Sequence, residues 1–261
     1  MTNAILRGKP DAGNPHVRFD EGEVASAKPR RGSLLYKCLS FWIVSIIGVF
    51  LLNGCETAPL FRGYRWYCRG AYGQSIRTFT YYLEHSRDRS NNKEERAAGF
   101  FYRGLAKTEL GRGREAIDDY RDALLRVPDF FYASFNLGVE HVRLHEYDLA
   151  LSMLRTSWAS VLKAGRGELD GLSLWNRKVF PRDRAYCFYY YGMAAVMCRE
   201  VDELGRLLRD AEAFEFKEKR AADAREVFRR IVSGELSLEE GREEVNSWLK
   251  RLGEKKGRCM G

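Results

Sequence analysis

Two stretches of this chain, 97–130 and 131–164, repeat one pattern of residues, and this repetition constrains the fold more than any other feature. Gly104 and Gly138 lie 34 positions apart. The other pairs with this separation are Phe101 with Phe135 and Ala116 with Ala150. A fixed period of this length is typical of stacked helical hairpins that share one continuous core. It favours a binding scaffold over a compact enzyme with a single cleft.

Small and apolar residues follow a helical spacing on both sides of a central break within 97–130. Gly111 and Gly113 favour a tight turn over a continued helix, because glycine readily adopts turn conformations. Pro128 ends the second helix, since a proline pushes the residue before it out of the α region. Each copy is therefore predicted to form two helices joined by a short turn.

The residues of 97–130 resemble the tetratricopeptide repeat, which combines small residues, an aromatic residue and a proline at set positions. The matching residues are Gly104, Gly111, Ala116, Tyr120, Ala123 and Pro128. The copy at 131–164 matches at Gly138, Tyr147, Ala150 and Leu154, with His145 at the turn-glycine position. The resemblance implies an all-α fold, a right-handed α-solenoid of helical hairpins. Four copies are expected within 55–218.

The outer copies match this pattern less closely. Residues 56–89 form a weak first copy, separated from the second by the polar stretch 90–96. A fourth copy at 185–218 follows a 20-residue insertion, 165–184. Two helices in 219–252 are expected to cap the solenoid, the second starting with the capping signature Ser237-Leu238-Glu239-Glu240, and 253–261 is a basic tail.

The N-terminal segment 1–54 combines basic residues with the apolar run 38–54, as secretory signals do. The run leads into Leu52-Asn53-Gly54-Cys55, which resembles a bacterial lipobox. The resemblance implies cleavage after Gly54 and acylation of Cys55. A retained single-pass signal-anchor and a buried apolar helix are the alternatives. The 33 residues before Leu34 are long for a signal and favour a start further along the chain.

Both membrane interpretations place the basic segment in the cytoplasm and the repeats in the periplasm or another extracytoplasmic space. The net charge of the chain is +8. Because segment 1–54 contains seven Lys/Arg and four Asp/Glu, the remainder has a net charge of +5. Its arginines are scattered among acidic residues, which disfavours nucleic acid and favours a membrane surface or a protein partner.

Residues that could carry chemistry are few. His141 and His145 have a ligand-like spacing, but no cysteine or catalytic glutamate accompanies them, so no metal site is expected. Cys187 and Cys198 lie about 16 Å apart along one predicted helix, too far for a disulfide, and are expected to be free thiols. We expect no cofactor and no catalytic activity.

The family resemblance also assigns the concave face to the first helix of each hairpin. The residues of that face are mostly apolar, and we treat them as a candidate partner or ligand groove. They are Phe101, Leu105, Tyr132, Phe135, Val139, Tyr186, Tyr189, Met193 and Met197. Phe101 and Phe135 stand where peptide-tail receptors of the family place lysine, which disfavours an acidic peptide tail.

The expected function is a membrane-tethered scaffold for protein–protein interactions in the bacterial cell envelope, within an assembly, secretion or transport complex. The alternative is a carrier of a hydrophobic small molecule in the groove, associated with a transporter. A third interpretation needs no ligand. The insertion, through Trp175 and Phe180, or the C-terminal helices would then fill the groove as intramolecular core.

Overall fold

The computed structural model describes residues 58–86, 93–165 and 179–258. These parts of the chain form ten α-helices and no strand, so the prediction of an all-α protein is confirmed. The helices are α2 (Ala58–Cys68), α3 (Tyr72–His85), α4 (Lys93–Glu109), α5 (Gly113–Arg126), α6 (Phe131–Arg143), α7 (Tyr147–Gly165), α8 (Pro181–Met197), α9 (Val201–Asp210), α10 (Lys219–Ser233) and α11 (Leu238–Arg258).

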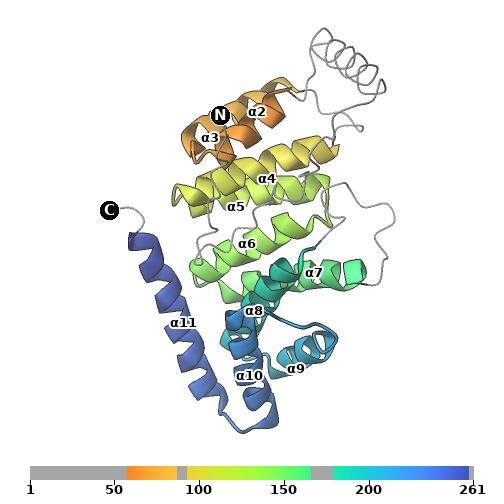
Figure 1. Ribbon diagram of the computed structural model, residues 1–261, viewed down its shortest axis with the longest axis vertical. Helices are drawn as coiled ribbons and strands as arrows, with labels where there is room; N and C mark the ends of the chain where they lie inside the picture. The colour runs from red at the N-terminus through yellow and green to blue at the C-terminus, as the bar shows by residue number, and fades with distance from the viewer. Residues whose placement is uncertain (1–57, 87–92, 166–178, 259–261) are drawn as a thin grey trace, which may run out of the picture.

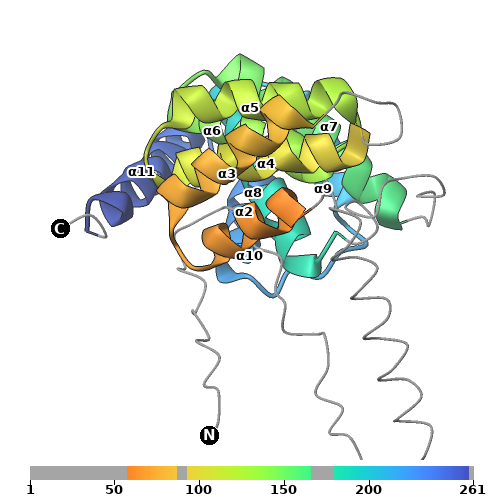
Figure 2. The ribbon, with the colours of Figure 1, turned by 90° about the horizontal axis from the view of Figure 1, so that it is seen from above.

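Helices that follow one another in the chain pack against each other. Figure 1 shows the pairs in order, from α2 and α3 at the top, through α4 and α5 and then α6 and α7, to α8 and α9. The helices α10 and α11 pack against α8 at the lower end. Seen from above, the upper pairs overlie those below them (Figure 2), so the stack follows the long axis of the molecule.

One turn geometry recurs between the two helices of each pair. The second residue after the first helix has a positive φ in all four turns. These residues are Gly70 (φ 74°), Gly111 (77°), His145 (61°) and Arg199 (63°). The N–H of the next residue donates to the carbonyl five positions earlier, at 2.9 to 3.0 Å, which is the main bond of a Schellman motif. Three of the four turns therefore lie at the 34- and 54-residue intervals found in the sequence.

A second recurring contact holds the helices of three pairs together. A glycine of the first helix faces an apolar side chain sixteen positions later, on the second helix. A Cβ atom on the glycine would come within 2.6 to 2.8 Å of that side chain. The pairs are Gly63 with Phe79, Gly104 with Tyr120, and Gly138 with Leu154. The first pair lies in the weakest copy, 56–89, where the sequence analysis did not identify it.

The fourth pair departs from this pattern. The space beside Gly192 on α8 is taken by Phe228 of α10, and a Cβ atom there would lie within 2.0 Å of that ring. Position 208, sixteen residues after Gly192, belongs to α9 but is not among the atoms nearest the glycine. The C-terminal helices therefore take over part of the packing that a second helix supplies in the earlier pairs.

The starts of two first helices also differ from the sequence prediction. Helix α4 begins at Lys93, so the last four residues of the polar stretch 90–96 are helical. Among them, Arg96 is buried and donates to the carbonyls of Leu83 and Ser86 at 3.1 and 2.6 Å. Helix α8 likewise begins at Pro181, inside the predicted insertion. Each extra turn packs on the end of a neighbouring element.

The predicted helical regions at the C-terminus are α10 and α11. Ser237 and Glu240 form the expected capping box, in which the Ser237 N–H donates to the Glu240 carboxylate at 3.0 Å and the Glu240 N–H donates to the Ser237 hydroxyl at 3.3 Å. Helix α11 continues to Arg258, through most of the stretch that we predicted as a basic tail. Its residue Trp248 packs on α8 and α10.

Candidate interaction surface

The five predicted groove residues on α4 and α6 are buried. Each has at most 1% of its surface exposed. They are Phe101, Leu105, Tyr132, Phe135 and Val139. Side chains without accessible surface bind a partner only after the fold rearranges. In the structure these five side chains therefore belong to the core.

The four predicted residues on α8 divide into two groups. Tyr189 and Met193 are buried, whereas Tyr186 and Met197 are half-buried. Tyr186 and Met197 are eleven residues apart, which is close to three full turns, so both lie on one side of the helix. Met197 also lines a surface cavity of about 350 Å³ together with His145 and Cys198. The accessible part of the predicted groove is therefore these two side chains on α8.

A series of neighbouring aromatic rings, which we call the aromatic row, runs through the core from α3 to α11. Successive ring centroids lie 4.9 to 6.3 Å apart. In order, the rings are Phe79, Tyr102, Phe101, Tyr132, Phe131, Phe135, Tyr190, Tyr189 and Trp248. Four of the nine predicted groove residues belong to this row. Contacts between aromatic rings at these distances stabilise a core beyond the effect of apolar burial alone.

The aromatic row bears on the interpretation in which the chain fills its own groove. Trp248 of α11 stacks on Tyr189 with ring centroids 5.6 Å apart and planes inclined by 29°. A C-terminal helix thus covers the α8 end of the predicted groove. Phe180, at the start of α8, is half-buried, and Trp175 lies outside the described residues. The covering is therefore shown for the C-terminal helices.

One carboxyl group is buried between two first helices. The Tyr132 hydroxyl of α6 donates to Asp183 of α8 at 3.1 Å. Burial raises the pKa of Asp183 to about 6, although the hydrogen bond from Tyr132 and the nearby charge of Arg182 both act to lower it. The pKa of Tyr132 is also raised, mainly by burial. This contact ties α8 to α6 across the predicted insertion.

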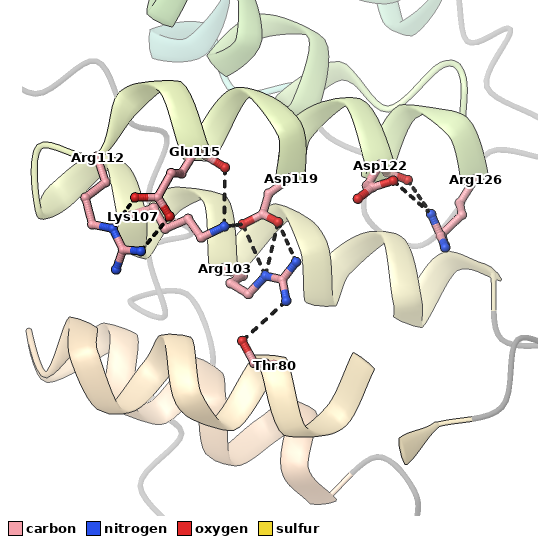
Figure 3. A network of polar contacts seen from close by, with 8 residues as sticks. All are labelled: Thr80, Arg103, Lys107, Arg112, Glu115, Asp119, Asp122 and Arg126. Atoms are coloured by element: carbon pink, nitrogen blue, oxygen red, sulfur yellow. Dashed lines mark hydrogen bonds and ion pairs between the residues drawn. The ribbon is translucent and has the colours of Figure 1, made fainter. Parts of the chain in front are cut away.

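A second buried carboxylate joins three consecutive helices (Figure 3). Asp119 of α5 pairs with Arg103 at 2.6 Å and with Lys107 at 2.8 Å, both on α4. The Arg103 guanidinium also donates to the Thr80 hydroxyl of α3 at 3.3 Å. Because two cations already neutralise the carboxylate, this cluster holds the pairs together and presents no unpaired group to a ligand.

Glu203 of α9 forms a third cluster of this kind. Its carboxylate accepts hydrogen bonds from Tyr191, Arg155 and Arg206. Burial alone would raise the pKa of Glu203, but the hydrogen bonds from Tyr191 and Arg155 outweigh it and keep the pKa below its ordinary value. The cluster links α7, α8 and α9.

The two histidines with a ligand-like spacing do not lie together on one ligand. A His141 ring nitrogen lies 2.6 Å from a Glu146 carboxylate oxygen, and a His145 ring nitrogen lies 2.7 Å from the Tyr147 hydroxyl. Among the described side chains, no group of three or more His, Cys, Asp or Glu could hold a metal ion. Cys187 and Cys198 are free, and burial raises the pKa of both thiols.

The membrane-associated features lie elsewhere in the chain. Cys55, Gly54 and the apolar run 38–54 are outside the described residues. Within 58–86, 93–165 and 179–258, every helix is too short or too polar to cross a bilayer.

A scan against protein-family models found no matching family, and searches of curated proteins and of solved structures found no significant match. The resemblance to the tetratricopeptide repeat therefore rests on residues of this chain alone. It stays a prediction, as does the lipobox.

The sequence analysis missed one group of residues that the structure brings together. Arg220, Trp248 and Arg251 line a cavity beside Tyr189. The apolar pattern of α11 identified Trp248 as a core residue, but two arginines 31 positions apart on separate helices have no spacing signal. Only the packing of α10 and α11 on α8 places them together.

Proposed function

We propose that this chain is a right-handed α-solenoid of tetratricopeptide-like hairpins that binds protein partners at a bacterial cell envelope. The observation that carries the proposal is the turn geometry shared by Gly70, Gly111, His145 and Arg199. A stack of equivalent hairpins presents an extended surface rather than an enclosed cleft, and such surfaces serve binding in repeat proteins.

The partner surface that we propose is the accessible side of α8. Tyr186 and Met197 keep part of their surface exposed there, whereas the equivalent positions on α4 and α6 are covered. Tyrosine and methionine are suited to interfaces, because one combines a ring with a hydroxyl and the other adapts its shape. A partner that contacts both would cover about three turns of α8.

Photocrosslinking from α8 tests this surface. A photoreactive phenylalanine analogue is placed at Tyr186 in the full-length chain, in cells of the source organism. The matched control carries the analogue at Leu125 of α5, which is 78% exposed and lies away from α8. We expect one discrete adduct from position 186 and none from position 125. Identical adducts from both positions, or none from either, would contradict the proposed surface.

The tether that we propose is an acylated Cys55. Mass spectrometry of the N-terminal peptide tests it, together with a Cys55→Ser variant. The proposal expects a diacylated Cys55 after cleavage behind Gly54, and an uncleaved variant that retains residues 1–54. A wild-type chain that retains residues 1–54 would instead favour the signal-anchor, and release of the wild-type chain by alkaline carbonate would contradict any membrane tether.

A further inference from the structure

A cavity of about 270 Å³ lies between α8, α10 and α11, on the side of Tyr189 that the predicted groove did not include. Each of the three helices contributes side chains to it. The lining residues are Tyr189, Arg220, Asp223, Trp248, Arg251 and Leu252. The volume is slightly below the usual range for drug-sized ligands, which begins at roughly 300 Å³. The cavity therefore suits a molecule with about one ring.

The wall formed by Tyr189 and Trp248 is flat and apolar. Their rings stack on each other, and the two residues are only 5% and 8% exposed, so their positions are set by the core. Burial raises the pKa of Tyr189 to about 12, and the charges of Arg220 and Arg251 act to lower it. The hydroxyl is thus a neutral hydrogen-bond donor at physiological pH, with two guanidinium groups in its surroundings.

The two arginines have no carboxylate partner among the described side chains. No ion pair joins Arg220 or Arg251 to an acidic residue there, although Asp223 lies three residues after Arg220 on the same helix. Arg220 is half-buried and Arg251 is exposed. Two cations and one carboxylate give the lining a net charge of +1, which favours a ligand with one negative charge.

The start of α10 adds to this positive potential. Arg220 stands in the first turn of the helix, which contains no acidic residue. The amino end of a helix carries a partial positive charge, so cations there are unfavourable and anions are favourable. The N-cap residue Glu218 makes no capping hydrogen bond through its side chain. The first turn of α10 therefore leaves its positive charge without a helix-capping anion.

We propose that this cavity binds a small organic carboxylate with an aromatic or branched aliphatic body. The carboxylate would pair with Arg220 and Arg251, and the apolar body would lie on Tyr189 and Trp248. The inference goes beyond the scaffold role, because it needs neither a protein partner nor the membrane tether. The same cavity offers no equivalent support for a neutral hydrophobic ligand, since two guanidinium groups would stay unpaired.

Isothermal titration of the full-length chain in lipid nanodiscs tests the proposal, with empty nanodiscs as the blank. The probes are benzoate, phenylacetate and 3-phenylpropionate, the neutral analogue 3-phenylpropanol, and inorganic phosphate. We expect the best carboxylate to saturate with a Kd of about 1 mM, a value in keeping with a ligand of about ten heavy atoms. The neutral analogue should bind roughly tenfold more weakly, because it lacks the charge-assisted hydrogen bonds.

Variants assign the binding to this cavity. Arg220→Gln and Arg251→Gln should each weaken carboxylate binding roughly tenfold, since each removes one charged hydrogen-bond donor. The control is Arg229→Gln, also on α10, whose side chain is 60% exposed and does not line the cavity. It should leave the affinity unchanged. Circular dichroism and the thermal midpoint verify that each variant is folded.

Several results would overturn the proposal. If none of the three carboxylates saturates below about 10 mM, the cavity does not bind this class of ligand. Equal affinity for 3-phenylpropanol would show that binding is apolar only, and equal affinity for phosphate would show a general anion site. Loss of affinity in the Arg229→Gln control to the same degree as in the cavity variants would place the site elsewhere. All of these results are independent of crosslinking at Tyr186.

Discussion

Glycine is used in this chain where two helices come too close for any side chain. Gly104 lies directly against the ring of Tyr120, and the equivalent contact joins Gly138 to Leu154. The sequence signal for these positions is their 34-residue separation. The physical reason is the space left by the absent Cβ atom, which an aromatic or leucine side chain occupies from the next helix.

Replacement of Gly104 by alanine should therefore destabilise the protein. The new Cβ atom would lie 2.7 Å from a Tyr120 ring carbon, which must shift within a filled core. We expect the free energy of unfolding to fall by about 1 to 3 kcal/mol, the usual range for overpacking. Chemical denaturation followed by circular dichroism measures this change.

Gly73→Ala is the matched control, because nothing lies within 4 Å of the new Cβ atom and Gly73 has ordinary helical backbone angles in α3. It should leave stability unchanged or raise it by up to about 1 kcal/mol. A similar loss in both variants would mean that the contact with Tyr120 is not the cause.

Asp183 should make the stability of the protein depend on pH. Below about pH 4 this carboxyl group is protonated in both the folded and the unfolded chain. As pH rises towards 7, the unfolded chain loses the proton first, near 3.8, and the folded chain must bury a charge, since its pKa is about 6. The free energy of unfolding therefore falls by about 3 kcal/mol across this range through this group.

The Asp183→Asn variant isolates that contribution, because an amide cannot ionise. Unfolding is measured at pH 4.0 and 7.5 for the variant and the wild type, which cancels the effect of all other titrating groups. The wild type should lose about 3 kcal/mol more than the variant between the two values. Asp210→Asn, at an exposed position, should behave like the wild type. Equal pH dependence in all three proteins would contradict the raised pKa.

At the scale of the helical element, each hairpin depends on one left-handed residue. Glycine adopts this conformation without a steric penalty, whereas other residues incur a cost of roughly 1 to 2 kcal/mol. Two of the four turns use glycine, and the other two use His145 and Arg199. The same backbone geometry is therefore retained where the favoured residue is missing, because packing of the two helices determines the turn.

Substitutions at these turns should have opposite signs. Gly111→Ala introduces a Cβ atom at φ 77° and should lower the free energy of unfolding by about 1 kcal/mol. Arg199→Gly relieves the same strain and should raise it by about 0.5 kcal/mol, after the greater freedom of glycine in the unfolded chain is included. The lost pair with Glu239 matters little, because both side chains are more than 60% exposed. Thermal denaturation measures both. Changes of the same sign would contradict a shared turn conformation.

Across the whole molecule, the helices contact mainly their neighbours in the chain, while the aromatic row connects one end of the stack to the other. In such an architecture stability is close to a sum of local terms and interfaces. A defect at one end should therefore loosen the adjacent helices and spare those at the other end.

Hydrogen exchange read by mass spectrometry tests this expectation at both ends of the row. Trp248→Ala should raise exchange in α8, α10 and α11 by roughly tenfold or more, because loss of a large buried aromatic side chain costs about 3 to 5 kcal/mol of local stability. Phe79→Ala should do so in α2, α3 and α4 instead. A uniform rise throughout the chain in both variants would show a single cooperative unit.

The helical hairpins follow from sequence alone, because small residues, turn glycines and apolar stripes act over short distances. Gly104, Gly111 and Pro128 determine their own surroundings within one copy. The intervals of 34 and 54 residues likewise locate the turns at His145 and Arg199, where no glycine marks them. The capping box of Ser237 and Glu240 is local in the same way.

Which face of α8 stays accessible was decided only by the tertiary structure. Phe101 and Phe135 carry the pattern of a groove, but whether such a face is open depends on rings that arrive from distant parts of the chain. Trp248 covers Tyr189 from 59 residues away, and Phe228 fills the space beside Gly192. An apolar residue has the same pattern in a core and in a binding surface, since both remove it from water. Only the packing of α10 and α11 distinguishes the two, and that packing also creates the cavity of Arg220 and Arg251.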